Sequence, residues 1–201
     1  MDLHQKQTYF NELAPRWDQL PAPPDAPAKI ARFVARCLSG SPGRVLDVGC
    51  GTGILLEYVE ASGASPGEFV ELDLAEAMLQ ENRKKPCATL AAHVCGEAQR
   101  PPFRQGAFDR VICFNALPHL VPIDHSLRQM FDCLCSDGLL AVGHLMSSGE
   151  LNQFHSTIGG AVGEDRLPSA GDLAALLARM GAEVVCQEEE AGWYLVQARR
   201  P

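Results

Sequence analysis

The chain has 201 residues, which is enough for one domain with a single substantial hydrophobic core. Its formal net charge of -8 argues against a nucleic-acid backbone or an anionic membrane as the main partner. No run of about 18 apolar residues is present, and residues 1–7 are too polar for a secretory signal, so we expect a cytoplasmic protein.

Apolar spacing and chain-breaking residues predict alternating helices and strands along the chain. The expected elements, in order, are helices over 4–20 and 28–38, strand 44–48, helix 54–62, strand 68–73, helix 75–84, strands 90–95 and 108–114, helix 123–135, strand 138–146, helix 170–180, and strands 183–188 and 192–199. The proline-rich segment 21–27 and the stretch 39–43 separate helices. This alternation predicts an α/β fold with a doubly wound, mostly parallel seven-stranded sheet that ends in an antiparallel C-terminal hairpin.

The chain contains eight cysteines, but their spacing is not that of a disulfide framework or a metal site. No C-x-x-C pair is present, and most of the cysteines lie within apolar runs such as Val111-Ile-Cys-Phe114. A cysteine in such a run usually behaves as a small apolar side chain. We therefore expect structural thiols, with Cys133 and Cys135 as the one closely spaced pair.

The segment Asp47-Val-Gly-Cys-Gly-Thr-Gly53 is the most informative part of the sequence. It follows an apolar strand, carries glycines at alternate positions and leads directly into a helix. Glycine permits positive φ and a close approach of ligand to backbone, and the helix directs its first N–H groups at that ligand. The segment therefore predicts a nucleotide-like cofactor site. Its spacing differs from the dinucleotide pattern G-x-G-x-x-G, and no Gly-Lys-Ser/Thr phosphate loop is present.

Three further segments follow the next strands in order. Asp73 ends the second strand about 20 residues after the glycines, where an acid can accept both ribose hydroxyls. Gly96-Glu-Ala-Gln-Arg-Pro-Pro-Phe103 follows the third strand, and Phe108-Asp-Arg-Val-Ile-Cys-Phe-Asn-Ala-Leu-Pro-His119 covers the fourth. Together with the glycine loop, these segments resemble the class I S-adenosylmethionine-dependent methyltransferases, particularly the small "type 11" branch. The resemblance covers about residues 40–145, and the opening from Phe10 to Asp18 is similar to that family's N-terminal helix.

The resemblance implies a Rossmann-like methyltransferase fold and S-adenosylmethionine as the cofactor. Asp47 would face the cofactor's ammonium group, and Asp73 would hold its ribose hydroxyls. Leu74 would lie against the adenine, and Glu97, where the family usually has aspartate, would accept from the adenine amino group. Asp73 as a helix cap and Glu97 as a solvated loop residue remain open. The implied cofactor-binding residues are Tyr9, Asp47, Gly49, Cys50, Gly51, Gly53, Asp73, Leu74, Glu97, Ala98, Asn115 and Ala116.

We expect a single methyltransferase domain over 1–201, made of a lid and hinge over 1–27 and a core over 28–201. The resemblance implies that the N-terminal helix closes over the cofactor, although plain packing of its aromatic residues is equally compatible with the sequence. The connection 144–168 is rich in glycine and is the part least like the family. Because long connections at the carboxyl edge of a sheet often carry recognition, we expect it to bind the acceptor.

Three histidines are candidate catalytic residues. Methyl transfer requires an aligned acceptor and the exclusion of water, and an acceptor that carries a proton at the reacting atom also benefits from a base. His119, His144 and His155 end or follow the fourth and fifth strands, so they are candidate bases or substrate contacts. Three converging histidines would also suit a metal ion, but the ligand spacing of a metal site is absent and we expect none.

A small-molecule methyl acceptor is expected, with no nucleic acid and no membrane as partner. The chain lacks an appended nucleic-acid module and the N/D-P-P-Y/F tetrad of amino-methylating nucleic-acid enzymes. The sequence leaves open a protein acceptor, the methylated atom (O, N, S or C) and the oligomeric state. Two other classes remain as alternatives: a catalytically silent S-adenosylmethionine-binding regulatory protein and, with less support, an NAD(P)-dependent oxidoreductase.

Overall fold

The computed structural model describes residues 3–38, 42–64 and 66–201. Its centre is one seven-stranded sheet in the order β3-β2-β1-β4-β5-β7-β6. The strands are β1 Arg44–Val48, β2 Glu68–Asp73, β3 Ala92–Cys95, β4 Phe108–Phe114, β5 Leu134–His144, β6 Glu183–Glu190 and β7 Trp193–Arg199. β1 to β5 pair in parallel, and β7 pairs antiparallel with both β5 and β6. The predicted doubly wound sheet with an antiparallel C-terminal hairpin is confirmed.

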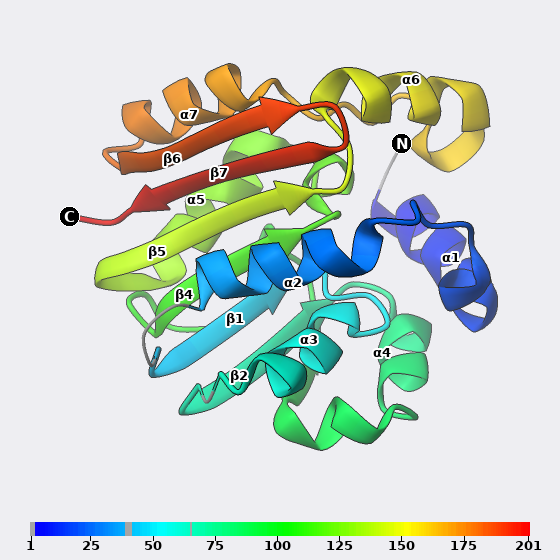
Figure 1. Ribbon diagram of the computed structural model, residues 1–201, viewed down its shortest axis with the longest axis horizontal. Helices are drawn as coiled ribbons and strands as arrows, with labels where there is room; N and C mark the ends of the chain where they lie inside the picture. Colours follow the sequence, from blue (N-terminus) through cyan, green and yellow to red (C-terminus); the bar gives the residue numbers. More distant parts are fainter. Residues whose placement is uncertain (1–2, 39–41, 65) are drawn as a thin grey trace.

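Helices cover both faces of the sheet and gather at one of its edges (Figure 1). The α-helices are α1 Leu3–Leu13, α2 Ala26–Cys37, α3 Ile54–Ser62, α4 Glu76–Asn82, α5 Ile123–Cys133, α6 Ser148–Ile158 and α7 Ala170–Arg179. Single 3₁₀ turns are η1 Ala14–Gln19, η2 Pro86–Leu90, η3 Leu117–His119 and η4 Gly160–Val162. One apolar cluster joins α5 and α7 to the sheet, and a second joins α2 and α3 to the opposite face.

Several element boundaries differ from the sequence-based expectation. The helix expected over 4–20 ends at Leu13, because Pro15 lies at the start of η1 and has no N–H to donate. The strand expected over 90–95 begins only at Ala92, after the turn that Pro86 starts. β5 begins at Leu134, four residues earlier than expected. Of the helix stop expected over 39–43, residues 39–41 lie outside the described residues.

The cysteines are free thiols, and most are buried. Burial raises the pKa of the Cys113 thiol near the carboxyl end of β4, so this side chain stays protonated and packs as an apolar group. Cys133 lies in the same apolar cluster, and burial raises the pKa of its thiol to about 11. Among the described residues, no helix has both the length and the apolar character that crossing a membrane requires.

The carboxyl ends of β1, β2, β4 and β5 meet at one edge of the sheet, where α1 and α6 also lie (Figure 1). Because β1, β2 and β4 are adjacent and parallel, the loops that follow them converge. The glycine loop after β1, Asp73 at the end of β2, and Asn115 after β4 therefore approach one another. This edge is where a ligand site is expected in an open α/β sheet.

Candidate functional site

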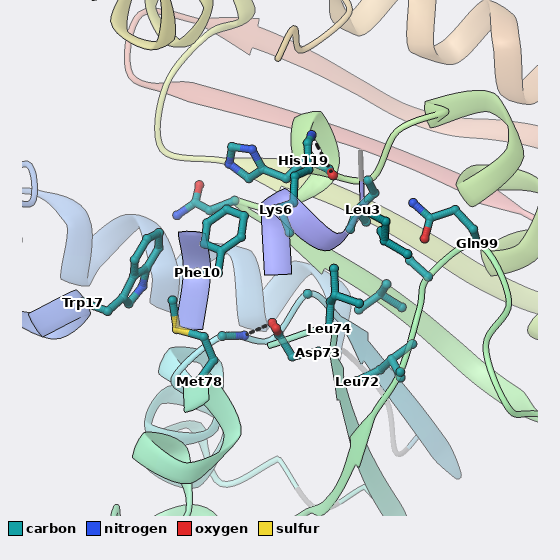
Figure 2. A pocket seen from close by; sticks show the side chains of 18 residues that line it. Leu3, Lys6, Phe10, Trp17, Leu72, Asp73, Leu74, Met78, Gln99 and His119 are labelled. Carbon is teal, nitrogen blue, oxygen red and sulfur yellow. Dashed lines mark hydrogen bonds between the residues drawn. The ribbon is translucent and has the colours of Figure 1, made fainter. Parts of the chain in front are cut away.

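A cavity lies between this edge of the sheet and the N-terminal helix α1 (Figure 2). The core contributes the glycine loop and the ends of β2 and β4, and α1 covers the opposite side. The cavity encloses about 80 Å³. Its lining residues are Leu3, Lys6, Phe10, Trp17, Val48, Gly49, Gly51, Leu72, Asp73, Leu74, Met78, Gly96, Ala98, Gln99, Asn115, Ala116, His119 and Leu120.

The three glycines of the loop serve two different purposes. All have positive φ, at 74° for Gly49, 56° for Gly51 and 76° for Gly53. A Cβ atom on Gly49 would lie 2.5 Å from the Cβ of Ala116, and one on Gly53 would lie 2.4 Å from the Asn82 amide. A Cβ on Gly51 would meet no atom within 4 Å. Gly49 and Gly53 are therefore required for packing, whereas Gly51 leaves space open beside the cavity.

The carboxylate of Asp73 is held in place by the backbone. Its Oδ2 atom accepts a 2.8 Å hydrogen bond from the N–H of Gly51, and its Oδ1 atom accepts one of 2.8 Å from the N–H of Ala75. Each carboxylate oxygen keeps a further lone pair for a ligand. Burial raises the pKa of Asp73, although these backbone hydrogen bonds oppose the rise. The helix that follows, α4, has Ala75 as its N-cap residue and no side-chain cap, so the structure does not support the helix-capping alternative.

Two more buried acids lie behind Asp73. Burial, followed by repulsion from Glu71 and Asp73, raises the pKa of Asp47 well above its usual range. Burial also raises the pKa of Glu71 to about 7, against a 2.8 Å hydrogen bond that its Oε2 atom accepts from Asn82. Since all three acids are harder to ionise than in water, a positively charged ligand in the cavity would favour their ionised forms.

The structure brings together part of the implied cofactor-binding set. Seven of its residues line the cavity, namely Gly49, Gly51, Asp73, Leu74, Ala98, Asn115 and Ala116. Asp47, Cys50 and Gly53 lie behind the cavity wall, and the Glu97 side chain is exposed to solvent. Tyr9 does not line the cavity, but its neighbour Phe10 does.

The sequence interpretation missed the face that α1 presents to the cavity. Leu3, Lys6 and Phe10 all line it, and their spacing of three and then four residues is that of one helix face. The cofactor-binding set implied by the resemblance contains Tyr9 instead, which lies about a quarter turn away from that face. Helical periodicity, with Lys6 included among the buried positions, would have found the three residues.

His119, His144 and His155 converge, but only His119 lines the cavity. The rings of His119 and His155 lie 5.1 Å apart. His144 is 2% exposed, and burial, together with the nearby His119 and His155, lowers its pKa to about 3. Its Nε2 atom and the hydroxyl of Tyr194 have no hydrogen-bond partner among the described residues. Within residues 3–38, 42–64 and 66–201, no group of three histidine, cysteine, aspartate or glutamate side chains is placed to hold a metal ion.

An open groove of about 530 Å³ lies on the far side of Asn115. The Oδ1 atom of Asn115, in the cavity wall, accepts a 3.1 Å hydrogen bond from the N–H of Leu145, in the groove wall. The groove is lined mainly by the segment after β5, including Met146 and Phe154, and by Lys29 of α2. The expected recognition segment 144–168 therefore borders a space of its own beside the cavity.

The segment 144–168 is an ordered part of the fold. Ser147 and Glu150 form a capping box at the start of α6. Glu150 also accepts a 2.8 Å hydrogen bond from the N–H of Gly192 in the β6–β7 turn. Asn152 hydrogen bonds to both the N–H and the carbonyl of Leu167, which closes the segment on itself. α6, Ser148–Ile158, is the helix of this segment.

A family model described as a methyltransferase domain matches residues 46–142. The chain is 28% identical over 151 residues to the malonyl-acyl-carrier protein O-methyltransferase of Geobacter sulfurreducens, covering 70% of this chain and 55% of the relative. It is 30% identical over 149 residues to the ubiquinone/menaquinone biosynthesis C-methyltransferase UbiE of Vibrio parahaemolyticus, covering 72% of this chain and 57% of the relative. The chain thus spans little more than half the length of these two relatives.

The fold also matches solved structures across nearly the whole chain. A SAM-dependent methyltransferase from Aquifex aeolicus superimposes with a TM-score of 0.71 and 17% identity, over 97% of this chain and 98% of that one. At this level of identity the likeness concerns the fold, and the chemistry has to be argued from the cavity itself.

Proposed function

Because the chain belongs to the class I S-adenosylmethionine-dependent methyltransferases, we propose that it transfers a methyl group from this cofactor to a small-molecule acceptor. One observation carries the proposal: the matched segment 46–142 supplies the glycine loop, Asp73 and Asn115, and these converge on one cavity. When bound, the cofactor supplies a methyl group on a positively charged sulfur, which is already an activated electrophile.

The residues of the cavity suit a cationic nucleoside. The backbone-held Asp73 carboxylate has acceptor positions for two ribose hydroxyls, and the open space at Gly51 admits a ligand close to the loop. The buried acids Asp47 and Glu71 favour a positive charge nearby. We assign the adenine side to Leu74 and Ala98, and the adenine amino group to Glu97 once its exposed side chain turns inward.

The remaining members of the implied set have supporting roles in the proposal. Asn115 and Ala116 form the wall beside the methionine part, and Gly49, Cys50 and Gly53 shape the loop beneath it. Tyr9 packs edge-to-face on Phe10, with ring centroids 5.2 Å apart, and so supports a cavity residue from outside. These assignments follow the family pattern residue by residue.

His119 is the strongest of the three candidate bases. It lines the cavity, whereas His144 lies in the core with a pKa lowered to about 3 and His155 is 4% exposed. We propose that His119 accepts the proton of an acidic acceptor while that acceptor takes the methyl group. His155 then acts on the acceptor indirectly, by packing against the His119 ring.

The groove bordered by 144–168 is the proposed acceptor site. It offers apolar surface from Leu145, Met146 and Phe154, with the charged groups of Lys29 and Glu150 at its margin. This lining favours an acceptor with an apolar body and a polar end. Exchanging 144–168 with the segment of a relative should change acceptor choice and leave cofactor affinity intact. Loss of cofactor affinity without a change of acceptor would contradict this role.

We also propose that residues 1–27 form a lid. The cavity beneath α1 encloses about 80 Å³, whereas ligand pockets usually measure about 300–1,000 Å³. α1 is held to the α4 region by polar contacts. Gln7 donates a 3.0 Å hydrogen bond to the Leu74 carbonyl, and Asn11 accepts a 2.9 Å hydrogen bond from the Ala77 N–H. A small apolar cluster, in which Phe10 packs against Ala14, Ala75 and Met78, adds to these contacts. In the proposal, α1 leaves this cluster and moves outward to admit the cofactor.

Calorimetric titration with S-adenosylmethionine, S-adenosylhomocysteine and NAD, followed by turnover against an acceptor panel, tests the proposal. Binding of the first two ligands with turnover supports it. Binding without turnover on any acceptor favours the silent regulatory protein. Binding of NAD alone favours the oxidoreductase and overturns the proposal.

A further inference from the structure

Lys6 anchors α1 to the rest of the protein, although a lysine is an unusual residue to bury under a helix. Among the residues of α1 it is the only buried one, with its side chain 3% exposed. A lysine is almost never fully buried unless it is paired. Its ammonium lies 2.6 Å from the Oδ1 atom of Asp165 and donates a 3.1 Å hydrogen bond to the carbonyl of His119. Figure 2 shows Lys6 directed toward His119 in the cavity wall.

Asp165 connects this lysine to the candidate base. While its Oδ1 atom binds Lys6, its Oδ2 atom lies 2.7 Å from the Nδ1 atom of His119. The Asp165 side chain is 8% exposed. Burial raises the pKa of this carboxyl, but the hydrogen bonds from His119 and Lys6 outweigh burial and hold it below the usual range. Asp165 is therefore an ionised carboxylate shared between a lid residue and a core residue.

The shared carboxylate determines which ring nitrogen of His119 carries the proton. An ionised carboxylate only accepts hydrogen bonds, so the Nδ1 atom of His119 must be the donor. The Nε2 atom of the neutral ring is then left without a proton and able to accept one. The other titratable groups around the ring are His155, His144 and Asp73.

Asp165 depends on Lys6 for its position. It follows a glycine-rich turn in which Gly159 and Gly160 both have positive φ, and its N–H donates a 3.0 Å hydrogen bond to the Val162 carbonyl within that same turn. The long-range contacts of the Asp165 carboxylate are those to His119 and Lys6. The carbonyl oxygen of Asp165 also lies 3.1 Å from the Nδ1 atom of His155, which holds the backbone in place. Removing the lysine would therefore leave the buried carboxylate half-paired, and its orientation toward the His119 ring would no longer be fixed.

We propose that Lys6 and Asp165 are positioning residues that prepare His119 as a base only when α1 is docked. The inference rests on the proposed function. In the reaction, a bond forms between the acceptor and the methyl carbon as the sulfur–methyl bond breaks. The acceptor's proton passes to the Nε2 atom of His119, so the positive charge lost at sulfur appears on the imidazole ring. Because Lys6 comes from the lid, the base is correctly set only in the closed site.

The test compares Lys6→Met, Lys6→Arg and Asp165→Asn with the control Lys84→Met, which removes an exposed lysine paired with Glu81. Imidazole ¹⁵N shifts of His119 report which nitrogen carries the proton, and they require neither acceptor nor turnover. We expect a protonated Nδ1 and a bare Nε2 in the wild type and the control. Lys6→Met and Asp165→Asn should show mixed tautomers, and Lys6→Arg should restore the wild-type pattern.

Kinetics provide the second readout. General-base catalysis is worth about 10²–10⁴-fold, so kcat should fall by about tenfold or more in Lys6→Met and Asp165→Asn, with a smaller change in acceptor KM. Unchanged His119 tautomers in both variants, or an equal effect of Lys84→Met, would overturn the inference. Should Lys6→Met fail to fold, mixed tautomers in Asp165→Asn alone support it and wild-type tautomers overturn it. Absence of S-adenosylhomocysteine binding in the wild type would instead count against the proposed function.

Discussion

The Oδ2 atom of Asp73, at the end of β2, accepts a 2.8 Å hydrogen bond from the backbone N–H of Gly51, in the loop after β1. This bond fixes the carboxylate at the cavity wall. Asp73→Asn keeps the size of the side chain but removes the charge. We expect S-adenosylhomocysteine to bind about 10–100-fold more weakly, since a hydrogen bond to a charged group is worth about 1.5–3 kcal/mol.

Calorimetric titration checks this prediction, with Asp124→Asn as the control because Asp124 is an exposed acid at the start of α5. Affinity within about threefold of wild type in Asp73→Asn, or an equal loss in the control, would show that Asp73 does not bind the ligand.

Alanine at two of the loop glycines should have different consequences. Both residues have positive φ, which costs a non-glycine residue about 1–2 kcal/mol. In Gly49→Ala the new methyl group would also collide with Ala116, so we expect a marked fall in Tm. In Gly51→Ala the methyl group meets no protein atom and projects into open space, so the larger effect should be on cofactor affinity. Thermal unfolding and titration of both variants distinguish these outcomes; a reversed order would contradict the geometry.

Glu71→Gln should stabilise the protein most at alkaline pH. Glu71 is fully buried, and its pKa is raised to about 7. A carboxyl whose folded pKa exceeds its unfolded value binds more protons in the folded state, so the free energy of unfolding falls as pH rises from about 4.5 to about 7. The difference amounts to about 3 kcal/mol. Glutamine lacks this ionisation and can still accept a hydrogen bond from Asn82. The variant's advantage in stability should therefore be absent near pH 4.5, grow as pH rises and be complete above about pH 7.

Urea unfolding at pH 5 and pH 8 measures this difference, with the exposed Glu60→Gln as a control. His93, whose Nε2 atom lies 3.1 Å from the Oε2 atom of Glu71, also contacts the site, and burial lowers the pKa of its ring. An equal stability gain at both pH values would refute the raised pKa of Glu71.

Phe154→Ala should impair acceptor binding and leave the cofactor site intact. Phe154 and Ile158 lie one turn apart on α6, and each is 48% exposed, but only Phe154 lines the groove. Removing its ring takes away apolar contact worth about 1.5–3 kcal/mol when fully buried. We expect acceptor KM to rise about tenfold in Phe154→Ala and to change little in Ile158→Ala. Equal effects of the two substitutions would place the acceptor elsewhere.

Much of the fold could be predicted from the sequence, because its signals are local. The apolar strand before Asp47 and the turn residues around each helix define elements within a few positions. The alternate glycines specify positive φ at three fixed places, and the structure has it at each one. The alternation of elements then leaves few topologies to consider.

The cavity wall was harder to predict because it depends on how distant elements meet. The periodicity of the first helix indicates an amphipathic segment but not which of its residues face the cavity, and the structure places Phe10 there rather than Tyr9. His144 ends β5 and His119 follows β4, yet only the packed structure places the first in the core and the second at the cavity. The pairing of Lys6 with Asp165 joins residues 159 positions apart and has no local signal.

The position of β7 in the sheet constrains how the chain can fold during synthesis. β6 precedes β7 in the chain, but among the described strands it hydrogen bonds only to β7, which lies between it and β5. β6 therefore has no place in the sheet until residues 193–199 have left the ribosome. A nascent chain that already holds the glycine loop and both candidate sites still exposes one side of β5, where chaperones and unwanted strand pairing can act.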